Sequence, residues 1–288
     1  MASRFTQLVL ATLFLLTACA EPNKSTFSCA VPAAKATRQI YKGSSVTSYD
    51  VTPAKRLFIS TNGTTGSLCT GTALSARIIL TAAHCFYGVK NASAIQIEDN
   101  RPSGRSTFGA EKFVVHPESF KPPANMSNEE ISKTAIDPGV DLAIVITNAD
   151  IPAPYAKVAD IGTKTGEVLN ILGYGDTNEG GALPNQLQMA PAYFSEFYDT
   201  KTSAGYVPKS VIETKPSSSG AIACQGDSGG PLVIASQGFQ ALIGVTSGVN
   251  VYGCGKATRV DFVRIVSFAS WINQTAGTYL TAFKADGC

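Results

Sequence analysis

Charged residues and histidines are scarce in this sequence of 288 residues, and long hydrophobic runs are absent. Charged residues make up 15%, against roughly 25% in an average soluble domain, while 44% of the residues are hydrophobic. Disordered chains are highly charged and poor in apolar residues, so disorder does not dominate here, and a coiled coil is excluded too. Lys and Arg total 23 and Asp and Glu 21, a net charge of +2. Because the basic residues are scattered, nothing predicts a nucleic acid or an anionic membrane surface as partner.

The N-terminus has the layout of a secretory signal, because Arg4 precedes the apolar run Leu8–Leu16 and small residues follow. That run is shorter than the roughly 20 residues of a membrane-spanning helix. Two cleavages remain open. Leu16-Thr17-Ala18-Cys19 resembles the lipobox of bacterial lipoproteins, which would remove residues 1–18 and lipidate Cys19. Ala18-Cys19-Ala20 fits ordinary signal peptidase, which would remove residues 1–20. We favour the lipobox, because Cys19 comes directly after the apolar run.

The cysteine count also favours export. Six cysteine thiols remain in either case, because lipidation takes Cys19 out of the thiol pool and cleavage after Ala20 removes it from the chain. Six is an even number that suits three disulfides in an oxidising compartment. The protein is therefore expected to be secreted or extracytoplasmic. If Cys19 is lipidated, it attaches the protein to a membrane, as a bacterial outer-membrane or periplasmic lipoprotein. The seven cysteines are Cys19, Cys29, Cys69, Cys85, Cys224, Cys254 and Cys288.

The rest of the chain divides at about Ile40. Residues 19–39 are rich in Ala, Pro, Ser, Thr and Lys and are interpreted as a linker or pro-segment. After Ile40, short apolar runs alternate with turn-forming residues, which is typical of an all-β sandwich or barrel. Apolar residues then recur at three-to-four spacing from Phe262 to Ile272, which predicts a helix at about 262–276. The apolar runs are 57–59, 78–80, 113–115, 142–146, 168–172, 232–234 and 242–245.

One serine and one of the two histidines stand in motifs that suit nucleophilic catalysis. Ser228 lies in the glycine-rich segment Gly226–Pro231, where glycines let the backbone turn tightly. A serine is a weak nucleophile unless a base accepts its proton, and His84, just after an apolar run, is the natural base. His116 precedes Pro117 and is interpreted as a structural or surface residue.

An imidazole base also needs a carboxylate to fix its tautomer and stabilise its cation. Asp141 opens an apolar run that has the character of a buried strand, and it fits this role. Asp137 is the nearest competitor, but it precedes Pro138 and is interpreted as a turn residue.

The segments TAAHC at 81–85, DLAIV at 141–145 and CQGDSGGP at 224–231 resemble, in order and spacing, the chymotrypsin/trypsin family of serine endopeptidases. The resemblance runs from about Ile40 to about Ile272. It implies an all-β fold of two six-stranded antiparallel barrels with a C-terminal α-helix, within a protease domain of residues 40–288. The N-terminal barrel is expected at about 40–155 and the C-terminal barrel at about 156–261, with the site in the cleft between them.

The resemblance also implies roles. Ser228 would attack a peptide carbonyl, His84 would act as base and then acid, and Asp141 would orient His84. The N–H groups of Gly226 and Ser228 would form the oxyanion hole. Ser247 matches a serine that contacts the triad aspartate and borders the substrate. No cofactor or metal is implied, and the substrate is a protein or peptide.

The disulfides are likewise implied by the resemblance. Cys69 and Cys85 match a family pair beside the catalytic histidine. Cys224 and Cys254 match a pair that braces the specificity pocket. Cys29 and Cys288 are left over; whether they pair, and so tether the pro-segment to the C-terminus, stays open.

Members of this family are usually made as zymogens, and the resemblance extends to activation. Cleavage of Gln39–Ile40 would free an Ile40 ammonium that pairs with Asp227 and orders the oxyanion hole. A trypsin-like activating protease would instead cut after Arg38 and leave Gln39 as an extension. The activating protease is therefore not trypsin-like, or a trimming step follows.

The specificity pocket differs from that of trypsin-like members. Ile222 stands six residues before Ser228, where those members carry an aspartate that binds Lys or Arg of the substrate. Val249 occupies a wall position where open pockets carry glycine. Together they predict a shallow apolar pocket for small or medium aliphatic side chains.

Two other interpretations were weighed. An α/β-hydrolase esterase carries G-x-S-x-G with the serine before the histidine. The flank here is Gly226-Asp227-Ser228-Gly229-Gly230, but His84 precedes Ser228 in the chain, which argues against this class. A proform-locked, non-catalytic binding or scaffold protein of the same fold is the remaining alternative, and the unusual Gln39–Ile40 junction is its motive.

Overall fold

The structure is a computed structural model that describes residues 36–37, 40–46, 52–60, 66–101, 104–123, 126, 138–160, 165–178, 184–251 and 253–281. Cys19, Cys29 and Cys288 lie outside the described residues, as do Gln39 and Asp137. The signal cleavage, lipidation and third disulfide therefore stay predictions. Among the helices of the described residues, none combines the length and the apolar character that a membrane span requires.

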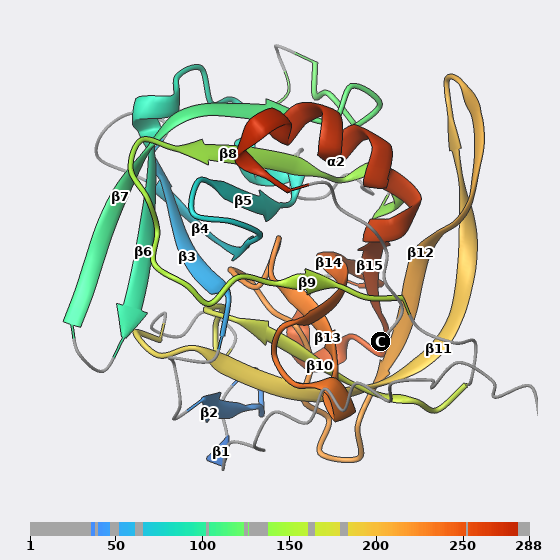
Figure 1. The fold of residues 1–288 in the computed structure, drawn as a ribbon. Helices are drawn as coiled ribbons and strands as arrows, with labels where there is room; N and C mark the ends of the chain where they lie inside the picture. Colours follow the sequence, from blue (N-terminus) through green and yellow to red (C-terminus); the bar gives the residue numbers. More distant parts are fainter. Residues whose placement is uncertain are drawn as a thin grey trace, which may run out of the picture.

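Six antiparallel strands close the first barrel (Figure 1). Leu57 and Ile59 of β3 are buried while Phe58 between them is exposed, as expected where alternate side chains point to opposite faces. Strands β5 and β8 are buried at every position, because the helix α2 covers the outer side of β8. In barrel order the strands are β3 (Ala54–Ser60), β4 (Gly66–Ala73), β5 (Ile78–Thr81), β8 (Ala143–Thr147), β7 (Gly104–Val115) and β6 (Ile95–Arg101).

A second ring of six antiparallel strands closes through β12 and β15. The predicted all-β fold of two six-stranded antiparallel barrels is therefore confirmed. In ring order the strands are β10 (Val168–Gly173), β11 (Gln188–Thr202), β12 (Gly205–Pro216), β15 (Val260–Arg264), β14 (Ala241–Val249) and β13 (Pro231–Ile234). Three short strands border it: β1 (Ala36–Thr37), β2 (Ser44–Val46) and β9 (Lys157–Val158).

The N-terminal segment of the domain joins the second barrel, whereas we predicted it with the first. Strand β2 pairs with β11 through Ser45 and Gln188, and β1 pairs with β2. Ile40 is completely buried in the hydrophobic cluster of the second barrel. The first barrel begins only at Ala54, because the preceding residues 40–46 lie along the second barrel.

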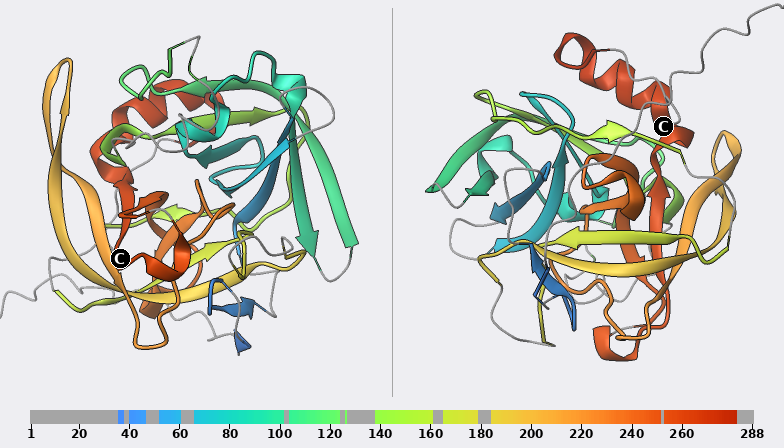
Figure 2. Two further views of the ribbon diagram at one scale, coloured as in Figure 1. Left: turned by 180° about the vertical axis from the view of Figure 1, so that it is seen from behind. Right: turned by 60° about the horizontal axis from the view of Figure 1, so that its bottom comes forward.

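The C-terminal helix is shorter than predicted. Helix α2 covers Ala269–Ala276, while Phe262 and Val263 lie in strand β15. Their three-to-four spacing continues that of the helix, but pairing with both β12 and β14 makes them the strand that closes the second barrel. Ile272 packs α2 onto the larger hydrophobic cluster, which is centred on the first barrel, and Gly277, with φ +54°, ends the helix. Figure 2 shows α2 beside the first barrel.

The other helices in the described part of the chain are short 3₁₀ turns. They are η2 (Ala83–Phe86), η3 (Ala92–Ala94), η4 (Pro138–Val140), η5 (Ala235–Gln237), η6 (Cys254–Lys256), η7 (Ile265–Phe268) and η8 (Gly277–Tyr279). Two of them matter for the site, because η2 carries His84 and η4 leads directly into Asp141.

Candidate active site

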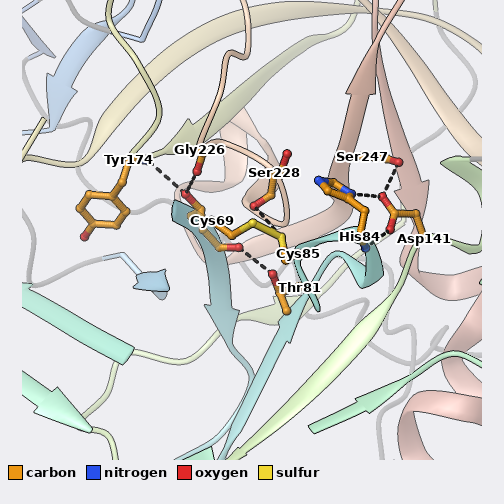
Figure 3. Close-up of a disulfide and its surroundings, with 10 residues drawn as sticks. Cys69, Thr81, His84, Cys85, Asp141, Tyr174, Gly226, Ser228 and Ser247 are labelled. Carbon is orange, nitrogen blue, oxygen red and sulfur yellow. Dashed lines mark hydrogen bonds and ion pairs between the residues drawn. A yellow bond between two sulfur atoms is a disulfide. The ribbon is translucent and has the colours of Figure 1, made fainter. Parts of the chain in front are cut away.

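Asp141 and His84 form a hydrogen-bonded pair at one end of the first barrel (Figure 3). Strand β5 runs into η2 and η4 runs into β8, and these strands are paired neighbours, so both side chains emerge together. Oδ1 of Asp141 accepts the backbone N–H of His84 at 2.9 Å, and Oδ2 lies 2.6 Å from His84 Nδ1. Ser247 Oγ of the second barrel donates to the same Oδ2 at 2.7 Å.

This environment sets the proton affinity of His84. Burial alone lowers the pKa of His84, but the attraction of Asp141 and its hydrogen bond outweigh burial, so the pKa is raised above 6.5. With Nδ1 donating to Asp141, the neutral ring leaves Nε2 free of its own proton. Nε2 can therefore accept a proton from a neighbouring group.

The loop that carries Ser228 is fastened to the first barrel beside His84. The Ser228 carbonyl accepts the Thr70 N–H of β4 at 2.8 Å, and Thr70 Oγ1 donates to the Gly226 carbonyl at 2.9 Å. The Cys69–Cys85 disulfide links β4 to η2, and Cys85 Sγ lies 3.9 Å from the Ser228 carbonyl oxygen. Figure 3 shows the His84 ring between Ser228 and Asp141.

Two backbone donors at this loop are available to an incoming oxygen. Within the described residues, the N–H groups of Gly226 and Ser228 have no hydrogen-bond acceptor. Gly226 has φ +95°, a conformation that side chains disfavour, and this turn exposes the donors. Gly229 is also required, since a Cβ there would lie 2.0 Å from Thr81 Oγ1.

The predicted pocket residues converge on the hydrophobic cluster of the second barrel. Ile222 is buried, and Val249 is partly buried against the same cluster. The Cys224–Cys254 disulfide joins the segments that carry them. Sequence reasoning missed Val260, the cross-strand partner of Val249, whose side chain lies on the same face of the sheet. Only the strand register reveals it, because nothing in the sequence identifies the residue that lies across from Val249 in the sheet.

Asp227 is fully buried without a cation. Its Oδ1 accepts the Gly175 N–H and its Oδ2 the Cys224 N–H, each at 2.8 Å. Burial raises the pKa of Asp227 to about 7, with Asp176 adding to the rise and the two N–H groups opposing it. In the described part of this uncut chain, no ion pair includes Asp227, and no interaction joins it to Ile40.

His116 has a structural place outside the site. It is buried, and its ring packs edge-on against Phe268 and Trp271 at centroid distances of 5.2 and 4.8 Å. Its Nδ1 accepts the Glu118 N–H at 3.2 Å. The interpretation of His116 as a surface residue is wrong, and the structural interpretation fits.

By spacing alone, Cys69, His84 and Cys85 could hold a metal ion. The two sulfurs are bonded to each other, so they offer no thiolate. These residues do not fit a metal site.

The fold and this arrangement define the class of chymotrypsin-like serine hydrolases. The Trypsin family profile matches residues 40–272. A trypsin of Saccharopolyspora erythraea is 32% identical over 187 residues, 62% of this chain and 74% of that protein. Chymotrypsin-like elastase family member 1 of Bos taurus is 30% identical over 221 residues, 72% and 77% of the two chains. The solved structure of neuropsin, a serine protease expressed in the limbic system of mouse brain, superposes with a TM-score of 0.60 at 23% sequence identity. The match covers 82% of this chain and 99% of the neuropsin chain, and it shows the fold alone.

The chain therefore belongs to the trypsin family and is a serine endopeptidase, which acts on protein or peptide substrates. The two disulfides of the described residues, in a family of this kind, indicate an extracytoplasmic protein.

Proposed function

We propose that this endopeptidase works through a Ser228–His84–Asp141 triad, is made as a zymogen, and cleaves after small or medium aliphatic residues. Ser228 Oγ attacks the peptide carbonyl while His84 Nε2 takes its proton. His84 then protonates the leaving amine, and water hydrolyses the acyl-enzyme by the same route. The N–H groups of Gly226 and Ser228 stabilise the oxyanion.

The observation that carries the triad is the position of Asp141. Asp141 accepts hydrogen bonds from the backbone N–H of His84, from its ring Nδ1 and from Ser247. These contacts fix the orientation of the imidazole and leave its Nε2 free. A surface histidine has no need of this arrangement. The two N–H donors of the Ser228 loop support the same function, since within the described residues they have no acceptor and can bind the developing oxyanion.

The zymogen proposal rests on Asp227. A buried carboxylate with no cation and a pKa raised to about 7 is poorly solvated. An ammonium freed at Ile40 would supply the missing charge, and Ile40 is already buried in the same barrel. The structure thus bears on the charge at Asp227, while Gln39 of the bond to be cleaved lies outside the described residues.

The substrate preference rests on three apolar groups, Ile222, Val249 and Val260. All three belong to one hydrophobic cluster, and none offers a charge to a basic side chain. A panel of peptides that differ only in the residue before the cleaved bond tests the preference. Cleavage mainly after Arg would refute it.

The deciding experiment is intact mass of the protein before and after limited proteolysis, with and without a fluorophosphonate probe. We expect labelling at Ser228 only in the form that begins at Ile40, and none in a Ser228→Ala variant. Labelling of the uncut chain would contradict the zymogen proposal but support the triad. If neither folded form were labelled, the triad would be wrong and the locked scaffold would take its place.

A further inference from the structure

The β11–β12 hairpin reaches beyond the barrel that it helps to close. Tyr198 and Val211 are the last pair at the barrel, and beyond them the two strands pair only with each other up to Thr202 and Gly205. Figures 1 and 2 show this extension rising from the second barrel to the level of the first. Closure of the barrel does not need it, so its contacts suggest another role.

The extension contacts the segment that delivers Asp141. Thr200 is buried against Gly139 of η4 so closely that a Cβ on Gly139 would lie 1.6 Å from Thr200 Oγ1. Val207 on the opposite strand packs against the larger hydrophobic cluster, which is centred on the first barrel and extends into the second. Both strands of the hairpin contact η4. Gly139 stands two residues before Asp141, so its position fixes the start of the catalytic segment.

A second contact reaches the same segment through a turn. Ser203 at the hairpin tip donates to Glu118 with its N–H at 2.8 Å and its Oγ at 2.6 Å. In the same turn, Ser119 Oγ donates to the carbonyl of Val140, the residue before Asp141. The His116 N–H donates to the Leu142 carbonyl at 2.8 Å, just after Asp141. The tip and this turn therefore hold both sides of Asp141.

We propose that the tip of the β11–β12 hairpin is a positioning element for Asp141, acting through Thr200 on Gly139 and Ser203 on Glu118. This inference rests on the proposed triad. The extension belongs to the second barrel, which also carries Ser228 and Ser247, while Asp141 belongs to the first. The contact thus ties the carboxylate to the barrel that holds the nucleophile.

Gly139→Ala is the direct test, because the added methyl must push η4 and Thr200 apart. A displacement of about 1 Å can cost roughly 100-fold in rate, so we expect kcat to fall roughly 10- to 100-fold with KM for a short peptide little changed. Thr200→Gly in the same variant removes the clashing side chain and should restore most of the loss. The control Glu111→Gln removes a surface carboxylate paired with Arg77 and should change nothing.

The pH profile separates positioning from simple stability. Asp141 and, at a ring distance of 6.4 Å, Tyr87 are the titratable groups that face His84. If Asp141 is displaced, the pKa of His84 falls back toward its ordinary value, and the acid limb of kcat/KM moves to lower pH. A lower melting temperature with an unmoved acid limb and unchanged kcat would overturn the inference.

Two milder variants decide the matter if Gly139→Ala does not fold. Ser203→Ala and Glu118→Gln should lower kcat by roughly 2- to 5-fold, the size expected of one exposed hydrogen-bonded pair, and Ser203→Thr should keep wild-type activity. Wild-type kinetics in both would overturn the inference. Ser228→Ala is assayed alongside: if it remained active, the proposed triad itself would fail, whatever the hairpin variants do.

Discussion

Asp141 receives two hydrogen bonds from His84 and one from Ser247, and only 1% of it is exposed. A buried carboxylate in this place keeps Nδ1–H on the side away from the nucleophile. Replacing it by an amide keeps the shape, but an amide N–H facing Nδ1 favours the tautomer with the proton on Nε2. That tautomer cannot accept the proton of Ser228.

Asp141→Asn should therefore lower kcat by roughly 10⁴-fold with KM nearly unchanged, since proteases of this type lose about that much when the carboxylate is replaced. In the unmodified enzyme, the raised pKa of His84 places the acid limb of kcat/KM above pH 6.5, because protonated His84 cannot act as base. Steady-state kinetics across pH measure both. Asp150→Asn, at an exposed position, is the matched control. Comparable rates in the two variants would contradict the assignment of Asp141.

Sequence reasoning located these residues because each stands in a contiguous motif. TAAHC, DLAIV and GDSGGP specify His84, Asp141 and Ser228 within a few residues. Val260 and Thr200 escaped it because their roles depend on partners distant in the chain, Val249 across a strand pair and Gly139 across a barrel boundary. Periodicity within a segment carries no information about such partners.

Among the elements, the seven apolar runs all lie in strands apart from Leu142, which immediately precedes β8. The long β11–β12 hairpin was not predicted, since residues 199–202 of its outer part are all polar and give no apolar alternation in the sequence, although Thr200 is buried in the structure. The helix prediction began too early at Phe262, where tertiary pairing overrides the local spacing. The strands that contain one of the seven apolar runs were therefore predicted. Strands without such a run were not, even where they contribute to the core, as β6 does through Ile97 and β12 through Ile212.

Helix α2 and η7 are anchored to the first barrel through His116, and this contact depends on pH. Burial lowers the pKa of His116, although Glu118 opposes the shift. The folded state thus holds a neutral ring while the unfolded state takes up a proton below pH 6.5, so stability falls as pH drops from 6.5 toward the lowered folded pKa. The packed Phe268 and Trp271 offer no charge to compensate.

His116→Asn should flatten that part of the stability curve. The amide oxygen can still accept the Glu118 N–H, while the titrating group is gone. Thermal unfolding of both proteins at a series of pH values below 7 measures the difference. An equally steep fall in the variant would show that another group titrates, and Glu118→Gln then identifies whether that group is Glu118.

In the whole molecule, the two barrels are joined at the site by Thr70 with Ser228, by Asp141 with Ser247, and by the hairpin tip. The overall architecture could be predicted through the family resemblance, because the motifs that carry it come from both barrels. The assignment of 40–46 to the second barrel could not, as chain order alone places that segment with the first. That assignment matters because it buries Ile40 in the barrel that contains Asp227.

The folded state of the uncut chain should therefore lose stability as pH rises, and activation should remove this loss. A carboxyl with a folded pKa of about 7 and an ordinary value of 3.8 stays protonated when folded and ionises when unfolded, so stability declines as pH rises between those values. The full decline amounts to roughly 4 kcal/mol. Asp227→Asn should abolish it in the uncut chain. Chemical denaturation of both uncut proteins between pH 4 and pH 7 measures the difference.

Cleavage of the Gln39–Ile40 bond should reverse the pH dependence of stability that Asp227 causes. The new ammonium stabilises the ionised carboxylate, so the pKa of Asp227 should fall below its ordinary value of 3.8. The cut enzyme should then gain stability as pH rises toward 3.8 and keep that stability at higher pH. Asp227→Asn, cut at the same bond, has no carboxylate to pair with, and the probe should label it poorly at Ser228. If the cut variant labelled as fast as the cut wild type, Asp227 would not couple cleavage to the reactivity of Ser228.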